Sequence, residues 1–584
     1  MSKIVFINSI NVESTTYQIP LGILSLASII KTKNYDVDII DFNYLWINKY
    51  CKKGTTMQES IEIMYSYIEK YKPSIVGFYC MCDSYHIAIM LSKYLKEKNH
   101  DIKIMFGGPQ ASLTSKITLE KFPWIDVVGI GEGESTIESI IKALEANSSF
   151  DSISSVTYRK NGAVFTNSEQ TLLENLDNLP YLDYTLINIE DYKCILIDAG
   201  RGCPFGCSYC STKTFWERKY RLKSPYRLVK EIKYLKEEFN KSEFELVHDL
   251  FTLKKSNVIE FCNLIIKENL NIQWGCSARI DTLDEEMILK MKEAGCGSIF
   301  IGIETGSQRM QKIINKNLNI NRVYSVIDIL NKYKFKVTTS FIYGFENETY
   351  EDIEETLNVM NFCMKKGCKI LINLCTVFVG TELYENVKNN LEFVNKYSLL
   401  TQVKDITYCE GIIKENPEIF PNFYTFRSQL RTDLEFMDIF ITYLYVFLYK
   451  GFKNTYDFLM EYYDNSVLNF YIGFMNIVPD FTKELFDKSK TNLVLSRLDL
   501  LQKFINEVDF NDKSGIIRDI FKFESNVIRL QLTDNFFEIT CSFKYNIVKI
   551  KTFNLDMKDA ELDPVIIKLY KNENKKIQAQ VLSL

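Results

Sequence analysis

The stretch RGCPFGCSYCS, residues 201–211, carries three cysteines in CxxxCxxC spacing and decides how this chain is interpreted. The thiolates of Cys203, Cys207 and Cys210 stand close together on a turn rich in Gly and Pro, so they can converge on one iron–sulfur cluster. A four-iron cluster needs four ligands, so this motif leaves one iron open to a small molecule. The alternatives are three zinc ligands that await a fourth, or three buried free cysteines. A structural zinc site usually shows paired CxxC knuckles, and no second pair occurs nearby.

The composition is that of a soluble globular protein of roughly three or four domains, with 584 residues, 46% of them hydrophobic and 25% charged. The net charge is −5 and no long basic stretch is present, so we expect no nucleic-acid partner. Fifteen cysteines without a disulfide-like framework, and no signal peptide, predict a reducing cytoplasm. The most apolar stretch, Phe436–Tyr449, is too short to span a bilayer and carries Asp438, which favours a buried helix.

Residues 3–146 alternate short apolar runs with amphipathic stretches of helical length. This alternation predicts an α/β domain with a parallel, doubly wound sheet, whose ligands bind at the carboxyl ends of the strands. Glycine-rich elements stand at those ends, where glycine lets the backbone approach a flat ligand closely. These elements are Pro20-Leu21-Gly22, Gly107-Gly108-Pro109-Gln110 and Gly131-Glu132-Gly133-Glu134. The expected strands are Ile4–Asn8, Val37–Asp41, Ile75–Tyr79, Ile102–Phe106 and Asp126–Ile130.

A connector and a second alternating region follow. Residues 150–193 predict a linker with a hairpin, in which Ile153–Arg159 and Ala163–Thr166 flank Lys160-Asn161-Gly162. From Cys194 to about Tyr384 the alternation of strands and helices resumes, and the cysteine motif directly follows the first strand. The expected strands of this region are Cys194–Ala199, Phe244–Val247, Ile272–Cys276, Ser298–Ile303, Lys336–Ile342 and Lys369–Thr376.

The cysteine motif, with Arg201-Gly202 before it and the aromatic Tyr209 before its last cysteine, resembles the radical S-adenosylmethionine (SAM) superfamily. The resemblance implies a partial six-stranded βα barrel over residues 194–389. It also implies a 4Fe-4S cluster on Cys203, Cys207 and Cys210, with SAM chelated by the open iron. Active sites of βα barrels lie at the carboxyl ends of the strands. The residues that the resemblance places near SAM are Tyr209, Asp249, Ser277, Arg279 and Glu304.

Specific roles are expected for three of these residues. Arg279 pairs its planar fork with the SAM carboxylate, unless it is a plain surface arginine. Glu304 accepts hydrogen bonds from the SAM ribose or the methionine amino group. Relatives often show an acidic pair where this chain has His248-Asp249, so Asp249 either contacts SAM or caps a helix.

The three glycine-rich elements of the first region together resemble the cobalamin-binding domain that precedes many radical SAM cores. The resemblance implies that residues 1–149 form a Rossmann-like cobalamin-binding domain, with the three elements around the cofactor. Some relatives carry a DxHxxG motif whose His ligates cobalt, but the loop Cys80–His86 lacks it, so we expect base-off, His-off cobalamin. His86 is expected to cap a helix or lie on the surface. The alternative is a domain that keeps the fold and binds nothing.

Residues 390–584 show no such resemblance. Phe423–Val508 predicts helices, and Asn526–Leu532, Phe536–Phe543 and Ile547–Phe553 predict a small antiparallel meander. We therefore expect a mostly helical C-terminal region with a small antiparallel sheet. It either closes over the barrel to hold the substrate or serves packing or dimerisation.

The resemblances together imply a cobalamin-dependent radical SAM enzyme. Such an enzyme cleaves SAM reductively to a 5′-deoxyadenosyl radical, and this one is expected to methylate an unactivated carbon of a peptide or secondary metabolite. An external one-electron reductant of the flavodoxin or ferredoxin type is also implied. Two alternatives stay open: a radical rearrangement, epimerisation or other maturation without methyl transfer, and a non-catalytic cobalamin or SAM sensor. The cysteine motif argues against a sensor, which would not need an open iron.

Overall fold

The structure is a computed structural model that describes residues 2–9, 18–50, 56–167, 172–192, 194–394, 409–486, 493–531, 538–545, 562–571 and 577–582. Contacts within the chain divide it into two compact units. Unit 1 comprises residues 1–347, 362–369 and 375–429, and unit 2 comprises residues 348–361, 370–374 and 430–584. The domain boundaries expected at residues 149, 193 and 389 stay predictions.

The first sheet of unit 1 has seven strands in the order β2-β1-β3-β4-β5-β6-β7. Strands β1 to β5 are parallel, as the sequence predicts, and the hairpin β6–β7 adds to β5 in antiparallel direction. The expected linker hairpin is therefore part of this sheet. The strands are β1 (Lys3–Asn8), β2 (Asp36–Asp41), β3 (Ile75–Tyr79), β4 (Lys103–Gly107), β5 (Val127–Gly129), β6 (Val156–Lys160) and β7 (Ala163–Asn167).

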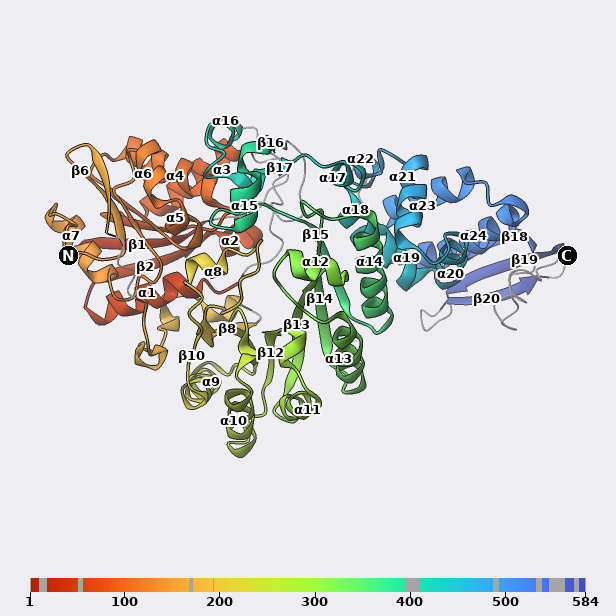
Figure 1. The fold of residues 1–584 in the computed structure, drawn as a ribbon, viewed down its shortest axis with the longest axis horizontal. Coiled ribbons are helices and arrows are strands. Elements are labelled where there is room, and N and C mark those ends of the chain that lie inside the picture. The colour runs from red at the N-terminus through yellow and green to blue at the C-terminus, as the bar shows by residue number, and fades with distance from the viewer. Residues whose placement is uncertain are drawn as a thin grey trace. The chain divides into compact units, whose positions relative to one another are not determined.

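Helices cover both faces of the first sheet, as α4 and α1 show in Figure 1. Along β1 the buried side chains alternate: Val5 and Ile7 pack toward α3 and α4, whereas Ile4 and Phe6 pack toward α1 and α7. A parallel sheet buried on both faces confirms the doubly wound prediction. The helices are α1 (Leu21–Thr32), α3 (Met57–Glu69), α4 (Tyr85–Lys98), α5 (Pro109–Leu113), α6 (Ser115–Lys121) and α7 (Ile137–Ala146).

Residues from far along the chain also pack against the helices on the α4 side of this sheet. Phe420 and Phe423 belong to the same apolar cluster as α3 and α4. His86, in α4, is fully buried and packs edge-on against Phe423, with ring centroids 5.1 Å apart. Burial lowers the pKa of His86 to about 3, so the imidazole is neutral. The expectation that His86 caps a helix or lies on the surface is wrong, because the residue is fully buried and Phe423 packs against it.

The second sheet has six strands in the order β15-β14-β13-β12-β11-β8, which confirms the predicted six-stranded core. Its neighbouring strands from β8 to β14 pair in parallel. Helices separate these strands along the chain, as a parallel sheet requires. The elements are β8 (Ile195–Asp198), α9 (Pro225–Phe239), β11 (Glu243–Val247), α10 (Lys255–Lys267), β12 (Gln273–Ala278), α11 (Glu285–Glu293), β13 (Cys296–Glu304), α13 (Ile320–Lys332), β14 (Lys336–Tyr343), α14 (Tyr350–Lys365) and β15 (Lys369–Leu374).

The cysteine motif lies between β8 and α9, in the loop of residues 202–211, called here the cysteine loop. Two short strands, β9 (Gly200–Arg201) and β10 (Arg221–Leu222), pair antiparallel and close this segment at its base. Gly202 has a φ of +83°, and a Cβ there would lie 2.0 Å from the carbonyl oxygen of Lys219. Only glycine therefore fits at the start of the loop. The short helix α8 (Thr212–Phe215) follows the last cysteine.

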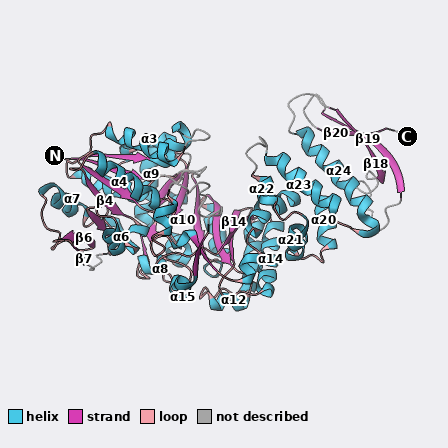
Figure 2. Ribbon diagram, turned by 90° about the horizontal axis from the view of Figure 1, so that it is seen from above, coloured by secondary structure: helices cyan, strands magenta, loops and turns pink. Residues whose placement is uncertain are grey.

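The part of unit 2 beyond residue 430 is mostly helical and ends in an antiparallel sheet, as predicted (Figure 2). Its strands are β18 (Glu538–Tyr545), β19 (Leu562–Lys571) and β20 (Ile577–Leu582), and only β18 coincides with a predicted strand. The strand predicted at Asn526–Leu532 is wrong over residues 526–531, which end α24 (Ser514–Gln531). Buried residues of α24 recur at helical spacing from Ile516, so the helix simply continues. The third predicted strand, Ile547–Phe553, lies outside the described residues.

The apolar stretch Phe436–Tyr449 is helical, as predicted. It comprises α18 (Met437–Ile439), a π-helical turn over Phe440–Tyr445 and the first residues of α19 (Val446–Gly451). Asp438 is buried within it. In the part of the chain that the structure describes, no helix has both the length and the apolar character to cross a bilayer.

Candidate functional site

A cavity of about 690 Å³ lies in unit 1 and takes its lining from both parallel sheets. The first sheet contributes the carboxyl ends of β3, β4 and β5, together with the first turn of α1. The second sheet contributes the ends of β8, β11, β12 and β13. Parallel strands end at one edge of their sheet, and here the two edges open onto the same space. The two ligand sites that the sequence predicts on separate sheets therefore share one cavity.

Most of the predicted cofactor residues line this cavity, but not all. Gln110 lies outside the lining, because its Nε2 donates a hydrogen bond to the carbonyl oxygen of Ile419 at 2.7 Å. Pro20, Tyr209 and the three cysteines also lie outside it. The predicted residues in the lining are Leu21, Gly22, Gly107, Gly108, Pro109, Gly131, Glu132, Gly133, Glu134, Asp249, Ser277, Arg279 and Glu304.

The glycines after β4 form an open wall of the cavity. A Cβ at Gly107 would meet nothing within 4 Å, so the space beside this residue is free. Gly108 has a φ of +96°, and its Cβ would lie 3.0 Å from the backbone of Cys80, so its backbone conformation needs glycine. The Tyr79 side chain lies beside them, and burial raises its pKa to about 12. A flat ligand can therefore approach the backbone at Gly107.

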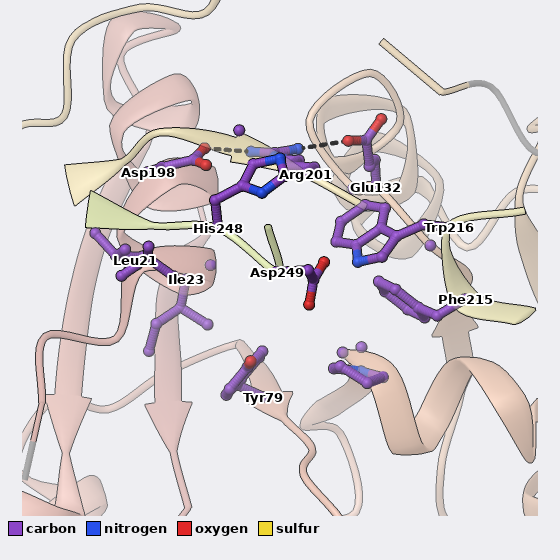
Figure 3. A pocket seen from close by; sticks show the side chains of 18 of the residues that line it. Leu21, Ile23, Tyr79, Glu132, Asp198, Arg201, Phe215, Trp216, His248 and Asp249 are labelled. Carbon is purple, nitrogen blue, oxygen red and sulfur yellow. Dashed lines mark hydrogen bonds and ion pairs between the residues drawn. The ribbon is translucent and has the colours of Figure 1, made fainter. Parts of the chain in front are cut away.

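The two acids after β5 bind an arginine that precedes the cysteine loop. Nη1 of Arg201 donates to Oε1 of Glu132 at 2.8 Å, and Nη2 of Arg201 donates to Oε1 of Glu134 at 2.7 Å. Nη2 also lies 3.1 Å from Oδ2 of Asp198. Figure 3 shows the Arg201 guanidinium between Asp198 and Glu132 at one side of the cavity. This ion network joins the first sheet to the second.

Glu132 is fully committed to this network. Its Oε2 accepts from Nη1 of Arg221 at 2.8 Å and from the backbone N–H of Leu173 at 2.7 Å. Burial by itself would raise the pKa of Glu132, but the hydrogen bond from Arg221 and the charge of Arg201 outweigh it and lower the pKa. The element Gly131–Glu134 is predicted to bind cobalamin. Its two carboxylates bind Arg201 and Arg221, so only Gly131 and Gly133 are left to face a ligand.

The cysteine loop lies next to the cavity, and its start is held by Asp249, two residues after β11. The backbone N–H of Gly202 donates to Oδ2 of Asp249 at 3.1 Å, so Asp249 supports the loop and does not cap a helix. Cys207 is buried, and burial raises the pKa of the thiols of Cys203 and Cys210. The three thiols are thus held in one shielded loop without disulfide partners.

Arg279 connects the cysteine loop to β12. Its Nε and Nη2 donate to the two carboxylate oxygens of Asp281 at 3.0 and 2.9 Å, and Nη2 also donates to the carbonyl oxygen of Lys316. The guanidinium carbon lies 3.8 Å from the centroid of the Phe205 ring. The residue is buried, so the alternative of a plain surface arginine is wrong. Its fork is bound to Asp281 within the protein.

Glu304 has a cation beside it that the sequence analysis did not identify. Nζ of Lys316 donates to Oε1 of Glu304 at 2.9 Å and lies 3.5 Å from the hydroxyl oxygen of Tyr209. Lys316 and Glu304 are both buried, and Glu304 has a positive φ of +70°, which is unusual for a residue with a side chain. Tyr209 therefore lies outside the lining and contacts Lys316, which is part of it.

Other residues of the lining also escaped prediction. His248 accepts a hydrogen bond from the N–H of Leu250 at Nδ1, and burial lowers its pKa to about 4. Phe215 and Trp216 follow the cysteine loop and face the cavity (Figure 3). Two adjacent aromatic residues so soon after Cys210 could have been predicted from the sequence to lie at the site. Lys316 and Glu245 gave none, because each is one charged residue among many in its segment.

Comparison with known proteins identifies the two halves of this site. Residues 197–360 match the family model described as the Radical SAM superfamily, and residues 7–141 match the model described as the B12 binding domain. The first range contains β11, β12, β13 and the last two residues of β8 in the second sheet, and the second range contains β3, β4 and β5 in the first sheet.

Comparison with whole proteins gives relatives and a similar fold. The chain is 30% identical over 433 residues to "Uncharacterized methyltransferase PH0819" of Pyrococcus horikoshii, covering 72% of this chain and 90% of the relative. It is 29% identical over 298 residues to the anaerobic magnesium-protoporphyrin IX monomethyl ester cyclase of Rubrivivax gelatinosus, covering 49% of this chain and 53% of the cyclase. Its fold is similar to the solved structure of the cobalamin-dependent S-adenosylmethionine radical enzyme OxsB, with a TM-score of 0.62 and 16% identity over 92% of this chain and 82% of that one.

The residues present fit the groups that these families bind. Three thiols from one loop match the protein ligands of a four-iron cluster with one open iron. The described residues contain no three His, Cys, Asp or Glu side chains placed to hold a single metal ion, whereas a four-iron cluster takes each cysteine on a different iron. The free space beside Gly107 suits a flat macrocycle. The chain belongs to the cobalamin-binding radical SAM enzymes, with a 4Fe-4S cluster, SAM and cobalamin as its cofactors.

Proposed function

We propose that this protein is a methyltransferase that methylates an unactivated carbon of a peptide or secondary metabolite. The observation that carries the proposal is the shared cavity, which the carboxyl ends of both sheets line. When bound, the cofactors supply reduction of SAM to a 5′-deoxyadenosyl radical, abstraction of a substrate hydrogen and transfer of a methyl group. A common cavity lets one substrate carbon reach both cofactors, which is the geometric requirement of such a reaction.

The protein's own residues have distinct tasks in this proposal. Cys203, Cys207 and Cys210 hold the cluster, and Asp249 fixes the start of their loop through Gly202. The ion pair between Arg201 and Glu132 holds the loop against the first sheet.

The remaining lining positions the other two cofactors. Gly107 and Gly108 give the corrin ring access to the backbone. Glu304 and Ser277 line the same cavity and are the residues proposed to contact SAM. The lining also limits access to a substrate radical by outside hydrogen-atom donors such as thiols.

The test is product analysis with anaerobically reconstituted protein. Protein that carries the cluster and cobalamin is supplied with SAM and a flavodoxin or ferredoxin as the one-electron reductant. Both 5′-deoxyadenosine and S-adenosylhomocysteine are expected, because radical formation and methyl donation each consume SAM. Production of neither would reject an enzymatic role and favour a sensor.

A second candidate is a radical reaction without methyl transfer. The similarity to a protein named as a cyclase, which covers about half of each chain, favours it. This reaction would give 5′-deoxyadenosine without S-adenosylhomocysteine, so the same experiment separates the two candidates.

A further inference from the structure

The cavity continues along the inner face of the second sheet, where it reaches a carboxylate that the site described above does not use. Glu245 lies on β11 beside Gly275 of β12, and Gly275 lies beside Ser298 of β13. A Cβ at Gly275 would lie 2.3 Å from Oε2 of Glu245 and 2.3 Å from Oγ of Ser298. Both oxygens therefore fold over the glycine, which makes room for them on this face.

Glu245 differs from the other charged residues of the cavity in its partners. The three basic residues of the lining each hold a carboxylate: Arg201 holds Glu132 and Glu134, Arg279 holds Asp281, and Lys316 holds Glu304. Within the part of the chain that the structure describes, Glu245 has neither a hydrogen bond nor an ion pair, and burial raises its pKa to about 7. A half-buried carboxylate without a counter-ion is costly, so a cationic ligand would stabilise it.

The surroundings of Glu245 add an apolar wall. Phe300 lies two residues beyond Ser298 on the same face of β13, and Val247 lies two residues beyond Glu245 on β11. Each side chain is 39% exposed although it belongs to the sheet that forms the core, and both line the cavity. The face of an aromatic ring attracts cations. A carboxylate below an aromatic ring and a branched aliphatic side chain suits a protonated nitrogen on an apolar stem.

We infer that Glu245, Val247 and Phe300 form a substrate subsite that binds the protonated amine of the substrate, with its carbon stem along Val247 and Phe300. The inference rests on the proposed function, because it names the substrate class of the same cavity. Lys316 is not a rival partner for the carboxylate, since it is bound to Glu304. The ammonium group of SAM is the rival occupant, and the experiment below separates the two.

The experiment measures affinity for two probes of equal length. Protein loaded anaerobically with cluster, cobalamin and SAM is titrated calorimetrically at pH 8 with hexylamine, which is protonated, and with 1-hexanol, which is neutral. Hexylamine is expected to bind at least tenfold more tightly. Glu245→Gln is expected to abolish this preference, whereas Glu245→Asp retains part of it. The control is Glu243→Gln, which removes an equal charge from an exposed position of the same strand and is expected to change nothing.

Several results would overturn the inference. Equal affinity for the two probes in the unmodified protein would do so without any variant, and so would an unchanged preference in Glu245→Gln. A loss of SAM affinity in Glu245→Gln, without loss of the probe preference, would assign the carboxylate to SAM. Cofactor content and SAM cleavage are measured on the same samples, so a protein that cleaves SAM but shows no preference rejects the subsite alone and leaves the proposed function intact.

Discussion

Arg201 and Glu132 are joined by a 2.8 Å hydrogen bond between Nη1 and Oε1, and this contact links the two halves of the cavity. Arg201 stands two residues before Cys203, and Glu132 stands three residues after the end of β5. This buried ion pair therefore holds the start of the cysteine loop to the carboxyl edge of the first sheet. Arg221 adds a second contact to the same carboxylate, so the link is a network and not one bond.

Removal of the charge on Glu132 is expected to destabilise unit 1. Glu132→Gln leaves Arg201 and Arg221 with an uncharged partner in a buried site, and breaking a buried ion pair typically costs about 3–5 kcal/mol. Thermal unfolding of anaerobically purified protein measures the loss as a lower Tm. The matched control is Glu138→Gln on α7, whose partner Lys142 is exposed, and which is expected to leave Tm nearly unchanged. Equal effects of the two variants would contradict the role of the network.

The same residue gives a pH dependence of defined sign. The native pKa of Glu132 lies below its ordinary value, so its contribution to stability is complete above the unfolded pKa of about 4.3. It declines as the pH falls from there through the native pKa. The difference in Tm between the unmodified protein and Glu132→Gln is therefore expected to stay constant from pH 8 to 6 and to shrink below about pH 4.3. A difference that grew on acidification would contradict the assignment of the carboxylate to the arginines.

Replacement of Cys203, Cys207 and Cys210 by Ala is expected to abolish the four-iron cluster and SAM cleavage. The three thiols are the only ligands that the cysteine loop offers, and a four-iron cluster cannot be retained without them. Iron and sulfide content and the charge-transfer absorbance measure the loss after anaerobic reconstitution. Cys194→Ala removes an exposed thiol just before β8 and serves as the control. A full cluster in the triple variant would reject the ligand assignment.

Arg279 and Glu304 are expected to support SAM binding. Arg279→Lys loses the bidentate fork that holds Asp281 and the stacking on Phe205, so it should weaken SAM binding about tenfold, or about 1.4 kcal/mol. Glu304→Ala is expected to act similarly, because it also frees Lys316. Equilibrium binding of SAM to cluster-loaded protein measures both effects. Glu286→Ala, an exposed acid on α11, is the control, and an unchanged dissociation constant in both test variants would remove these residues from the site.

Gly107→Val is expected to block cobalamin binding while the cluster is retained. The Cβ at this position meets no protein atom within 4 Å, so the branched side chain would occupy only the space beside the cavity wall. Gly108 is unsuitable for this test, since its positive φ would strain the backbone. Gly297→Val is the matched control, because its Cβ also meets nothing within 4 Å. Absorbance after supply of hydroxocobalamin measures retention, and equal retention in both variants would place the corrin ring elsewhere.

Bound cobalamin is expected to be base-off and His-off. His86 is buried against Phe423 and does not line the cavity, so its imidazole is not placed to reach the cobalt. The electron paramagnetic resonance spectrum of the cob(II)alamin state is expected to lack nitrogen superhyperfine splitting, and His86→Leu should leave it unchanged. Nitrogen splitting that disappears in His86→Leu would show that the histidine does reach the cofactor.

The regular parts of the fold were predictable because their signals are local. The strands β3 and β14 fall within one residue of their predicted bounds. Such bounds are predictable because the alternation of apolar runs and amphipathic helices depends only on residues close together in the sequence. The strand predicted at Asn526–Leu532 shows the limit of such signals. A short apolar run does not distinguish a strand from the last turns of a helix, and α24 continues through it.

Contacts between distant segments were not predictable in this way. Nothing near His86 indicates that Phe423 packs against it, and nothing near Glu304 indicates that Lys316 pairs with it. The resemblance to the cobalamin-binding domain places Glu132 and Glu134 at the cofactor, because they belong to the glycine-rich element at the end of β5. Their arginine partners lie on another sheet, so no local pattern in the sequence points to them.

The sequence by itself determined the two parallel sheets, the cysteine loop and the glycines after the first-sheet strands, because spacing and backbone freedom act over a few neighbouring residues. The tertiary structure alone decided that both sheet edges open onto one cavity, that the acids after β5 hold Arg201, and that Glu245 stands in this cavity without a counter-ion among the described residues. The physical reason is that charge pairing and burial depend on distances in space, which residues far apart along the chain acquire only when the chain folds.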